Sequence, residues 1–263
     1  MFTSLCGYLN LAATGLSASS TLAIGVTILF AYAIYGMTGF GSSIVAVPLL
    51  TQLIPLRAVT PIMLLLDLVV GTLLGTRNRS AVQMGELYRL GPWILIGMVL
   101  GVTLLTSSPE QPLELLLGVA VVLYSSWRIT SRQAFRELSR TWACPFGMVG
   151  GCFTAIFGTG GPLYTLYLGG RLRSHEQFRA TISLLITSTA IARLVMFALY
   201  GLLGNPVIYH LTLWLLPCAI GGLVVGARLR GKIPAQSTAS VVWGILIFSG
   251  GSLIVHAISG MRG

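Results

Sequence analysis

Charge is what this sequence has least of. Only 8% of its 263 residues are charged, whereas a soluble domain carries about a quarter. Apolar residues make up 55% of the chain, and the mean hydropathy is +0.87. This composition excludes an ordinary soluble protein. It predicts an all-α polytopic membrane protein whose helices are surrounded by the lipid bilayer.

Residues that ligate metals or activate nucleophiles are also sparse. The three histidines lie near helix ends or in a loop (His175, His210 and His256). The four cysteines lack the spacing of a disulfide framework or a metal site (Cys6, Cys144, Cys152 and Cys218). Hydrolysis by Ser42 or Ser43 would need a general base within reach, and Asp67 has no neighbouring metal ligand. We therefore predict no metal, no cofactor and no enzymatic activity.

Acidic residues are fewer than basic ones. Sixteen Lys and Arg residues stand against six acidic residues, which gives a formal net charge of +10. Such an excess can indicate nucleic-acid binding, but here the basic residues lie almost entirely between apolar segments. That pattern is typical of loops on the cytoplasmic side of a membrane, so we expect no nucleic-acid partner. The basic connections are residues 77–89, 128–140, 171–179 and 228–232, whereas 107–112 and 201–206 contain no basic residue.

Most of the apolar stretches have the length of a spanning helix, which is about 20 residues. Single spans are predicted over residues 59–76, 90–106, 113–127, 180–200, 207–227 and 238–258. Two further uncharged stretches, 21–54 and 143–170, are too long for one span and too short for two spans with a turn. Each contains a glycine cluster near its middle. We expect each to be a re-entrant hairpin, in which one helix enters the membrane, breaks at the glycines and is followed by a shorter returning helix.

The sequence also repeats itself at an interval of about 120 residues. The cluster Gly39–Ser43 has its counterpart in Gly158–Pro162. The later markers follow in the same order in both halves: Pro92, Gly97, Gly101 and Gly118 are echoed by Pro217, Gly222, Gly226 and Gly244. We therefore predict an N-terminal repeat over residues 1–127, a basic cytoplasmic connection over 128–141 and a C-terminal repeat over 142–263.

The loop charges predict the orientation of the two repeats. With the four basic connections in the cytoplasm, the hairpin 143–170 starts and ends on the cytoplasmic side, and the hairpin 21–54 starts and ends outside. Each repeat then has about four elements, of which the first is re-entrant and three cross the membrane. Three crossings are an odd number, so the second repeat is inverted and both termini lie outside. Arg57 is the one discordant charge, because it falls on the outer side.

The glycine clusters are the predicted binding site. A helix that begins inside the membrane offers unpaired N–H groups and the positive end of its dipole, which together bind an anion. Inversion brings both helix starts toward the middle of the membrane, where they face one small anion. The alternative is that the glycines only allow close helix packing. The candidate substrate-binding residues are Gly39, Gly41, Ser42, Ser43, Gly158, Thr159, Gly160 and Gly161.

Two charged residues lie inside predicted spans. Asp67 is in the stretch 59–76 and Arg193 in the equivalent stretch 180–200. Charges at membrane depth are costly and face a partner or a cavity. In one interpretation Arg193 helps to hold the anion, while Asp67 orients it or carries a proton. In the other, the two residues form a structural ion pair between their helices.

These motifs resemble a known family. The runs Gly39–Leu50 (GFGSSIVAVPLL) and Phe157–Leu168 (FGTGGPLYTLYL) look like the paired signatures of the TauE/SafE sulfite exporter family, also called the 4-toluene sulfonate uptake permease family. The tract Gly226–Arg230 is similar to that family's C-terminal end. The resemblance extends over most of the chain from about residue 20. One departure is that Ser42 and Ser43 stand where the second copy has glycine and proline, so the two half-sites are unequal.

The resemblance implies a multi-pass transporter of the bacterial inner membrane with inverted repeats and re-entrant first and fifth elements. It implies small sulfur-containing anions as substrates, namely sulfite, sulfoacetate or another organosulfonate. We expect transport by alternating access at a site between the repeats, with protons as a candidate coupling ion. An anion channel with the same site and a transporter of another small organic anion are the alternatives, and no oligomeric state is indicated.

Overall fold

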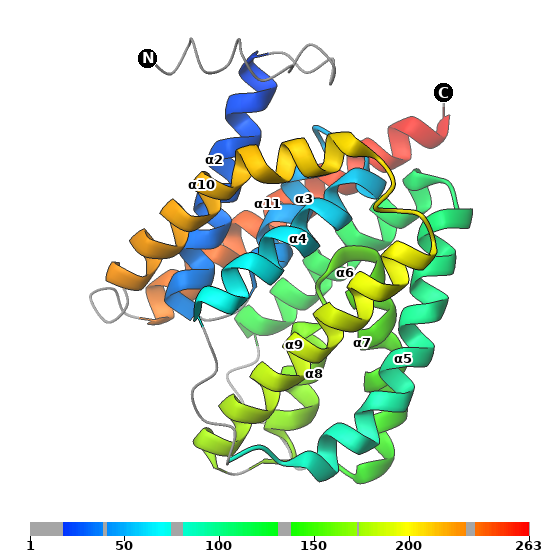
Figure 1. The fold of residues 1–263 in the computed structure, drawn as a ribbon, viewed down its shortest axis with the longest axis vertical. Helices are drawn as coiled ribbons and strands as arrows, with labels where there is room; N and C mark the ends of the chain where they lie inside the picture. The colour runs from blue at the N-terminus through cyan, green and yellow to red at the C-terminus, as the bar shows by residue number, and fades with distance from the viewer. Residues whose placement is uncertain are drawn as a thin grey trace.

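A computed structural model describes residues 18–38, 41–74, 81–130, 138–172, 174–229 and 235–262. These residues form ten α-helices and one short 3-10 helix, and no strand occurs among them, so the all-helical prediction is confirmed (Figure 1). The elements are α2 (Ala18–Thr38), α3 (Ser42–Leu50), α4 (Leu56–Leu74), α5 (Met84–Ser107), α6 (Glu110–Thr130), η2 (Arg140–Trp142), α7 (Ala143–Phe157), α8 (Gly161–Gly169), α9 (His175–Leu199), α10 (Pro206–Leu229) and α11 (Ala235–Arg262).

Both long uncharged stretches are broken at their glycine clusters, which is why eight expected elements become ten helices. The stretch 21–54 forms α2 and α3, and the stretch 143–170 forms α7 and α8. Gly41 has φ 101° and Gly158 has φ 72°, and this left-handed conformation strains any residue with a Cβ atom. Gly158 therefore ends α7, and Gly41 leads into α3.

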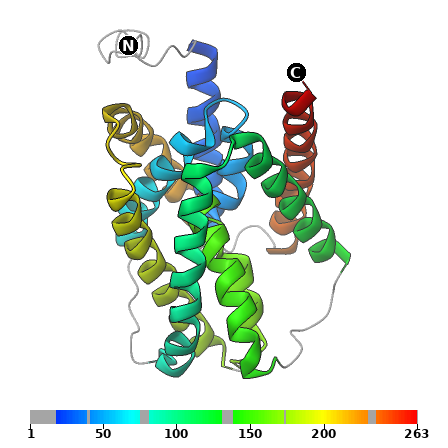
Figure 2. The same ribbon diagram turned by 90° about the vertical axis from the view of Figure 1, so that its right-hand side faces the viewer.

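The two hairpins open toward opposite ends of the molecule. In Figures 1 and 2, α3 turns back toward the end where α2 begins, at the top, whereas α8 turns back toward the start of α7, at the bottom. The first hairpin has the longer arm: α2 has 21 residues and α7 has 15. At 1.5 Å per residue, α2 is about 31 Å long and matches the hydrocarbon thickness of a bilayer.

Five of the described helices are long and apolar enough to cross a membrane, namely α2, α5, α9, α10 and α11. The helices at the other two expected spans, α4 and α6, are not among the five. Large apolar side chains cover much of the exterior: Leu199 and Phe248 are each 78% exposed and Leu22 is 70% exposed. Such exposure is unfavourable in water and natural in lipid.

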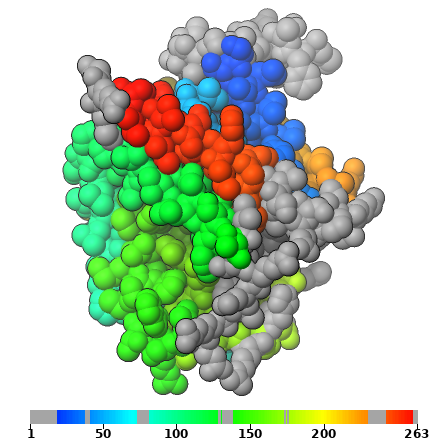
Figure 3. All heavy atoms as spheres, turned by 180° about the vertical axis from the view of Figure 1, so that it is seen from behind, coloured from blue at the N-terminus to red at the C-terminus, as the bar shows by residue number. Residues whose placement is uncertain are grey.

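Helices of one half pack against helices of the other. Helix α5 lies along α7, α10 lies along α2, and α6 lies along α11. Figure 3 shows the last of these pairs at the back of the molecule, where α11 runs beside α6. Each of the three contacts joins a helix before residue 131 to a helix after residue 138, so neither half is an independent bundle.

Glycines make the first two of these contacts close. A Cβ atom on Gly97 would collide with the carbonyl of Met148 in α7, and one on Gly101 would lie 2.7 Å from the carbonyl of Cys152. In the second half, the equivalent residues Gly222 and Gly226 meet carbonyls of α2 in the same way, those of Leu29 and Ala33. The echoed glycines thus have the same structural role, which is to let two backbones approach each other.

The last pair of echoed glycines, Gly118 and Gly244, does not share one structural role. Gly118 on α6 faces Gly250 on α11, whose carbonyl would lie 2.9 Å from a Cβ at Gly118, whereas Gly244 faces open space.

Arg57, the charge that did not fit the predicted orientation, binds the C-terminal end of α5. It donates from Nε to the Leu105 carbonyl at 3.0 Å and from Nη2 to the Thr106 and Ser108 carbonyls at 3.0 and 2.9 Å. Carbonyls at a helix end lack intrahelical partners, so Arg57 caps α5.

Candidate functional site

The two helix breaks meet at one place inside the protein. A Cβ atom added to Gly158, at the end of α7, would lie 3.0 Å from the Oγ atom of Ser43, at the start of α3. The same Cβ atom would lie 2.6 Å from Nη1 of Arg193 on α9. Both breaks and the mid-span arginine are therefore adjacent, although they come from three distant parts of the chain.

Arg193 is buried, with only 3% of its surface exposed. Its Nη2 atom donates to the Thr60 carbonyl at 2.6 Å, and its Nη1 atom donates to the Thr154 carbonyl at 3.3 Å. The guanidinium carbon lies 5.1 Å from the centre of the Phe197 ring, a cation–π contact. These acceptors are neutral, so they orient the guanidinium without cancelling its charge.

One donor of Arg193 has no partner. The Nε atom is buried without a hydrogen bond, and so is the Oγ1 atom of Thr60, whose carbonyl accepts from the same arginine. Buried polar groups in proteins almost always have a partner, and each exception needs an explanation. A small oxyanion beside Arg193 would accept from Nε and balance the charge.

Asp67 lies at the other break, on α4, and is partly buried. Its Oδ1 atom accepts hydrogen bonds from the Tyr32 and Ser42 hydroxyls, each at 2.7 Å, and its Oδ2 atom accepts from the Ser43 hydroxyl at 2.9 Å. It makes no ion pair with Arg193. The hydroxyls at the start of α3, which the sequence assigned to a substrate, are donated here to the protein's own carboxylate.

The start of α8 has one packed glycine and one open glycine. Pro162 occupies the first turn, and Gly160 and Gly161 supply N–H groups of the kind that a helix start leaves without intrahelical partners. A Cβ atom on Gly161 would meet nothing within 4 Å, whereas one on Gly160 would collide with the Thr154 hydroxyl. Open space thus lies beside Gly161, while Gly160 is fixed by its packing.

The remaining predicted residues are spread around this place. Gly41 provides the left-handed turn before α3, and Thr159 lines a cavity on the side of α6. Gly39 lies outside the described residues, as do residues 1–17 of the predicted N-terminal repeat and 131–137 of the connection 128–141. Among the described residues, no group of three or more His, Cys, Asp or Glu side chains is arranged to hold a metal ion.

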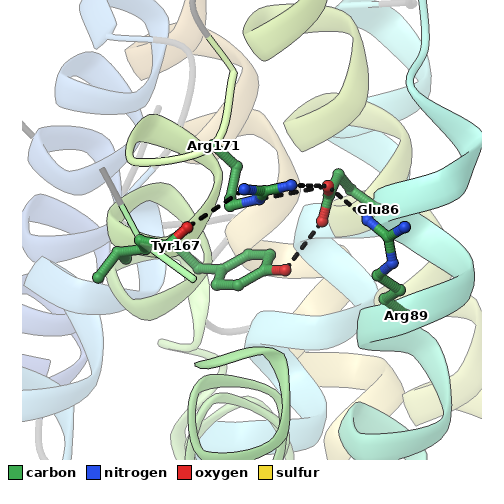
Figure 4. A network of polar contacts seen from close by, with 5 residues as sticks. Glu86, Arg89, Tyr167 and Arg171 are labelled. Carbon is green, nitrogen blue, oxygen red and sulfur yellow. Dashed lines mark hydrogen bonds and ion pairs between the residues drawn. The ribbon is translucent and has the colours of Figure 1, made fainter. Parts of the chain in front are cut away.

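A second polar cluster, which the sequence did not predict, lies at the end where α5 and α7 begin (Figure 4). Glu86 is its centre: the carboxylate accepts from the Tyr167 hydroxyl at 2.8 Å and pairs with Arg89 at 2.9 Å and Arg171 at 3.1 Å. Arg171 also donates to the Leu138 carbonyl at 3.2 Å. The cluster ties α5 to the end of α8 and to the segment before α7.

Sequence reasoning had little chance of finding this cluster. Tyr167 and Arg171 are 81 and 85 residues from Glu86, and although Tyr167 lies in the second signature, Phe157–Leu168, that motif gives no sign of a contact with Glu86. The only available signal was that Glu86 is acidic in an otherwise basic connection, 77–89.

Comparison with known proteins agrees with this architecture. The model of the family described as sulfite exporter TauE/SafE matches residues 24–253. The chain is similar to the probable inner membrane transporter protein TsaS of Comamonas testosteroni, with 29% identity over 199 residues that cover 74% of this chain and 82% of that protein.

A second relative is the probable sulfite/organosulfonate exporter TauE of Cupriavidus necator. The identity is 29% over 171 residues, which cover 64% of this chain and 65% of that protein, just under two thirds of its length. No solved structure matches the chain.

Proposed function

Because the chain belongs to the sulfite exporter TauE/SafE family, and is therefore a membrane transporter and not an enzyme, we propose that it carries a small sulfur-containing anion through the bacterial inner membrane. Sulfite, sulfoacetate and other organosulfonates are the proposed substrates. The observation that carries the proposal is the unpaired Nε donor of Arg193, which is buried beside both helix breaks. A compact oxyanion fits this donor and the positive helix starts, and a cation does not.

The proposed site has unequal halves. On one side, the start of α8 has Gly160 and Gly161 with their backbone N–H groups, and open space lies beside Gly161. On the other side, α3 starts with Ser42 and Ser43, whose hydroxyls are donated to Asp67 in this conformation. Gly41 and Gly158 provide the turns at the two breaks. Arg193 supplies the only side-chain charge of positive sign within the proposed site, and Thr60 a further hydroxyl.

The mechanism that we propose is alternating access between inverted repeats. Support comes from the two hairpins, which open toward opposite ends (Figure 2). Support also comes from the reciprocal packing of α5 on α7 and of α10 on α2. If these packed pairs rock about a site at the helix breaks, the site opens to one side of the membrane and then to the other. The Glu86 cluster joins α5 to the end of α8 at one end of the molecule.

We propose that protons are the coupling ion and that Asp67 carries them. Its carboxylate occupies the start of α3, where it repels an approaching anion. Protonation of Asp67 removes that repulsion and leaves Ser42 and Ser43 free to contact the substrate.

A proton gradient directed into vesicles tests this role of Asp67. With the wild-type protein, such a gradient should drive sulfite accumulation. Asp67→Asn should retain sulfite exchange and lose the response to the gradient. An equal response in both proteins would contradict this role.

Sulfite counterflow in proteoliposomes tests the proposed function. Vesicles loaded with unlabelled sulfite should take up radiolabelled sulfite saturably, and protein-free vesicles should not. Sulfoacetate, taurine, sulfate and chloride are the competitors. Inhibition by sulfur anions alone supports the proposal. Flux that neither saturates nor shows counterflow would indicate a channel. No sulfite flux from folded protein would exclude sulfite and leave an organosulfonate or another small organic anion as the substrate.

A further inference from the structure

A buried pair of hydroxyl groups joins α7 to α8 beside the proposed anion site. Thr154 lies in the last turn of α7, and Tyr164 lies in the first turn of α8. Their Oγ1 and Oη atoms are 2.8 Å apart, and only 6% of Thr154 and 1% of Tyr164 are exposed. Neither residue was among the candidates predicted from the sequence, and the proposed transport mechanism gives neither side chain a role.

The hydrogen bonds of this pair have a definite direction. The Thr154 hydroxyl donates to the Gly150 carbonyl at 2.8 Å. Because a hydroxyl carries one hydrogen atom, the Tyr164 hydroxyl is the donor in the bond between the two side chains. The bonds therefore run from α8 through Tyr164 and Thr154 to the backbone of α7, and each buried donor has an acceptor.

The Tyr164 ring also packs between two glycines. A Cβ atom on Gly150, in α7, would lie 2.5 Å from Cε1 of this ring, and one on Gly160, directly before α8, would lie 3.0 Å from its Cε2. Both distances are too short for a real Cβ atom, so only glycine leaves room for the ring at these two positions. The hydrogen bond and the two contacts together fix the first turn of α8 against the last two turns of α7.

The same turn of α7 also holds the buried arginine. The Thr154 carbonyl accepts from Nη1 of Arg193 at 3.3 Å and from the backbone N–H of Gly158 at 2.9 Å. Thr154 therefore links the two groups that are proposed to bind the anion: its hydroxyl holds the start of α8 through Tyr164, and its carbonyl holds the guanidinium. Hydrogen bonds to an oxyanion need donor–acceptor distances of about 2.7–3.2 Å, so a small shift of α8 would break contacts to a bound anion.

We propose that Thr154 and Tyr164 are positioning residues, which set the distance between the start of α8 and Arg193 and thereby the affinity for the anion. Neither side chain touches the substrate. They act through the groups that do, by holding them at a spacing that one small oxyanion can bridge. The inference rests on the proposed function, because it takes the anion to lie between the start of α8 and the guanidinium.

Two tyrosines on α8 provide a matched test. Tyr167, like Tyr164, is buried and donates its hydroxyl, but its acceptor is Glu86 Oε2 at 2.8 Å, beyond the far end of the helix (Figure 4). Tyr164→Phe should weaken the binding of radiolabelled sulfite to the purified protein at least about fivefold, and Tyr167→Phe should change it by less than about twofold. Equal losses in the two variants would indicate a merely structural effect and overturn the proposal, as would unchanged binding by Tyr164→Phe.

Substitutions of Thr154 test the other side of the same hydrogen bond. Thr154→Val removes the hydroxyl and keeps the carbonyl that holds Arg193, whereas Thr154→Ser keeps both. Thr154→Val should weaken sulfite binding at least about fivefold, and Thr154→Ser should bind within about twofold of the wild type. Because Thr154→Val and Tyr164→Phe remove one shared bond, the double variant should bind no more weakly than Thr154→Val alone. Losses that add would overturn the shared role.

Hydrogen–deuterium exchange gives a readout that needs no substrate. Backbone amides within residues 160–164 should exchange faster in Tyr164→Phe than in the wild type, and at the wild-type rate in Tyr167→Phe. If the wild type binds no sulfite, sulfite fails as the substrate, and this exchange still decides the role of the hydroxyl pair. Acceleration in Tyr164→Phe alone supports the proposal. Unchanged exchange in Tyr164→Phe, or equal acceleration in both variants, would overturn it.

Discussion

Arg193 carries a cost that the fold does not offset. An unpaired buried donor costs about 1–3 kcal/mol, and more when the group is charged. The Thr60 and Thr154 carbonyls hold the guanidinium in place, and Nε remains without a partner. Asp67, the nearby carboxylate, is held by three hydroxyls instead of by Arg193. Arg193 and Asp67 thus lie close together without a direct ion pair, and we propose that this arrangement suits a site that binds and releases an anion.

Gly158 and Gly161 are a matched pair for testing the break before α8. Gly158→Ala forces a side chain into a left-handed conformation, which costs about 1–2 kcal/mol, and places a Cβ atom 2.6 Å from Arg193 Nη1. Gly161→Ala meets nothing within 4 Å. We expect Gly158→Ala to lower the thermal unfolding midpoint and abolish sulfite counterflow, and Gly161→Ala to leave the midpoint unchanged. Similar midpoints for the two variants would contradict the described geometry.

At the scale of elements, glycines determine how the two halves fit together. Gly97 and Gly101 bring α5 against the backbone of α7, and Gly222 and Gly226 bring α10 against the backbone of α2. Apolar side chains gain little by leaving lipid for another helix, so close backbone packing has to supply the attraction. These four glycines allow close helix packing, whereas Gly41 precedes the start of α3 and Gly158 ends α7.

Neighbouring glycines on α10 test this role. A Cβ atom on Gly222 would collide with the Leu29 carbonyl, whereas one on Gly221 would meet nothing within 4 Å. Gly222→Ala should destabilise the protein by about 1–3 kcal/mol, the usual cost of overpacking. Gly221→Ala should be neutral. Thermal unfolding of the two purified variants in the same detergent measures the difference. A neutral Gly222→Ala would exclude the close contact between α10 and α2.

The Glu86 cluster offers a second matched pair. Arg171 has 23% of its side chain exposed and Arg89 has 38%, and both pair with the same carboxylate, which is 9% exposed. Arg171→Gln removes the ion pair that joins this buried carboxylate to the end of α8, although Tyr167 still donates to it, and should cost about 1–3 kcal/mol. Arg89→Gln removes an outer ion pair within one helix and should cost less than about 1 kcal/mol. The reverse order of thermal stability would contradict the description of this cluster.

The sequence predicted these elements better than it predicted their contacts. Apolar length located the helices, although α4 and α6 are not among the five candidate spans, and the glycine clusters located both breaks, because these are local properties of the chain. The family resemblance is confirmed by the match over residues 24–253. The roles of Arg57 and Glu86 could not be predicted from the sequence. Both residues bind groups that are distant along the chain, and such contacts leave no local sequence pattern. The donation of Ser42 and Ser43 to Asp67 depends on packing in the same way.

At the scale of the whole molecule, the ends of the bundle differ in charge. The end where α5 begins holds Glu86, Arg89 and Arg171 (Figure 4). At the opposite end, where α5 finishes, Arg57 is bound to backbone carbonyls. Because Arg57 serves as a helix cap, its charge need not be counted among the loop charges. The remaining loop charges are consistent with a single orientation, in which the Glu86 end faces the cytoplasm.

Cysteine labelling tests that orientation. In a background with the native cysteines replaced by alanine, we expect a membrane-impermeant maleimide to label Ser107→Cys in intact cells. Tyr88→Cys, 74% exposed and next to the Glu86 cluster, should react only after the membrane is permeabilised. Both positions are exposed on the protein surface, and reaction of Tyr88→Cys after permeabilisation would show that its failure in intact cells reports sidedness and not burial. Labelling of Tyr88→Cys in intact cells would invert the proposed topology.

Binding of radiolabelled sulfite to the purified protein tests the central claim most directly. Arg193→Gln removes the buried charge between the breaks, and Arg179→Gln removes an exposed charge from the same helix. Both variants should unfold at temperatures close to that of the wild type. The wild type and Arg179→Gln should bind sulfite saturably, and Arg193→Gln should not. Equal binding by a folded Arg193→Gln would show that the anion does not lie where the two helix breaks meet.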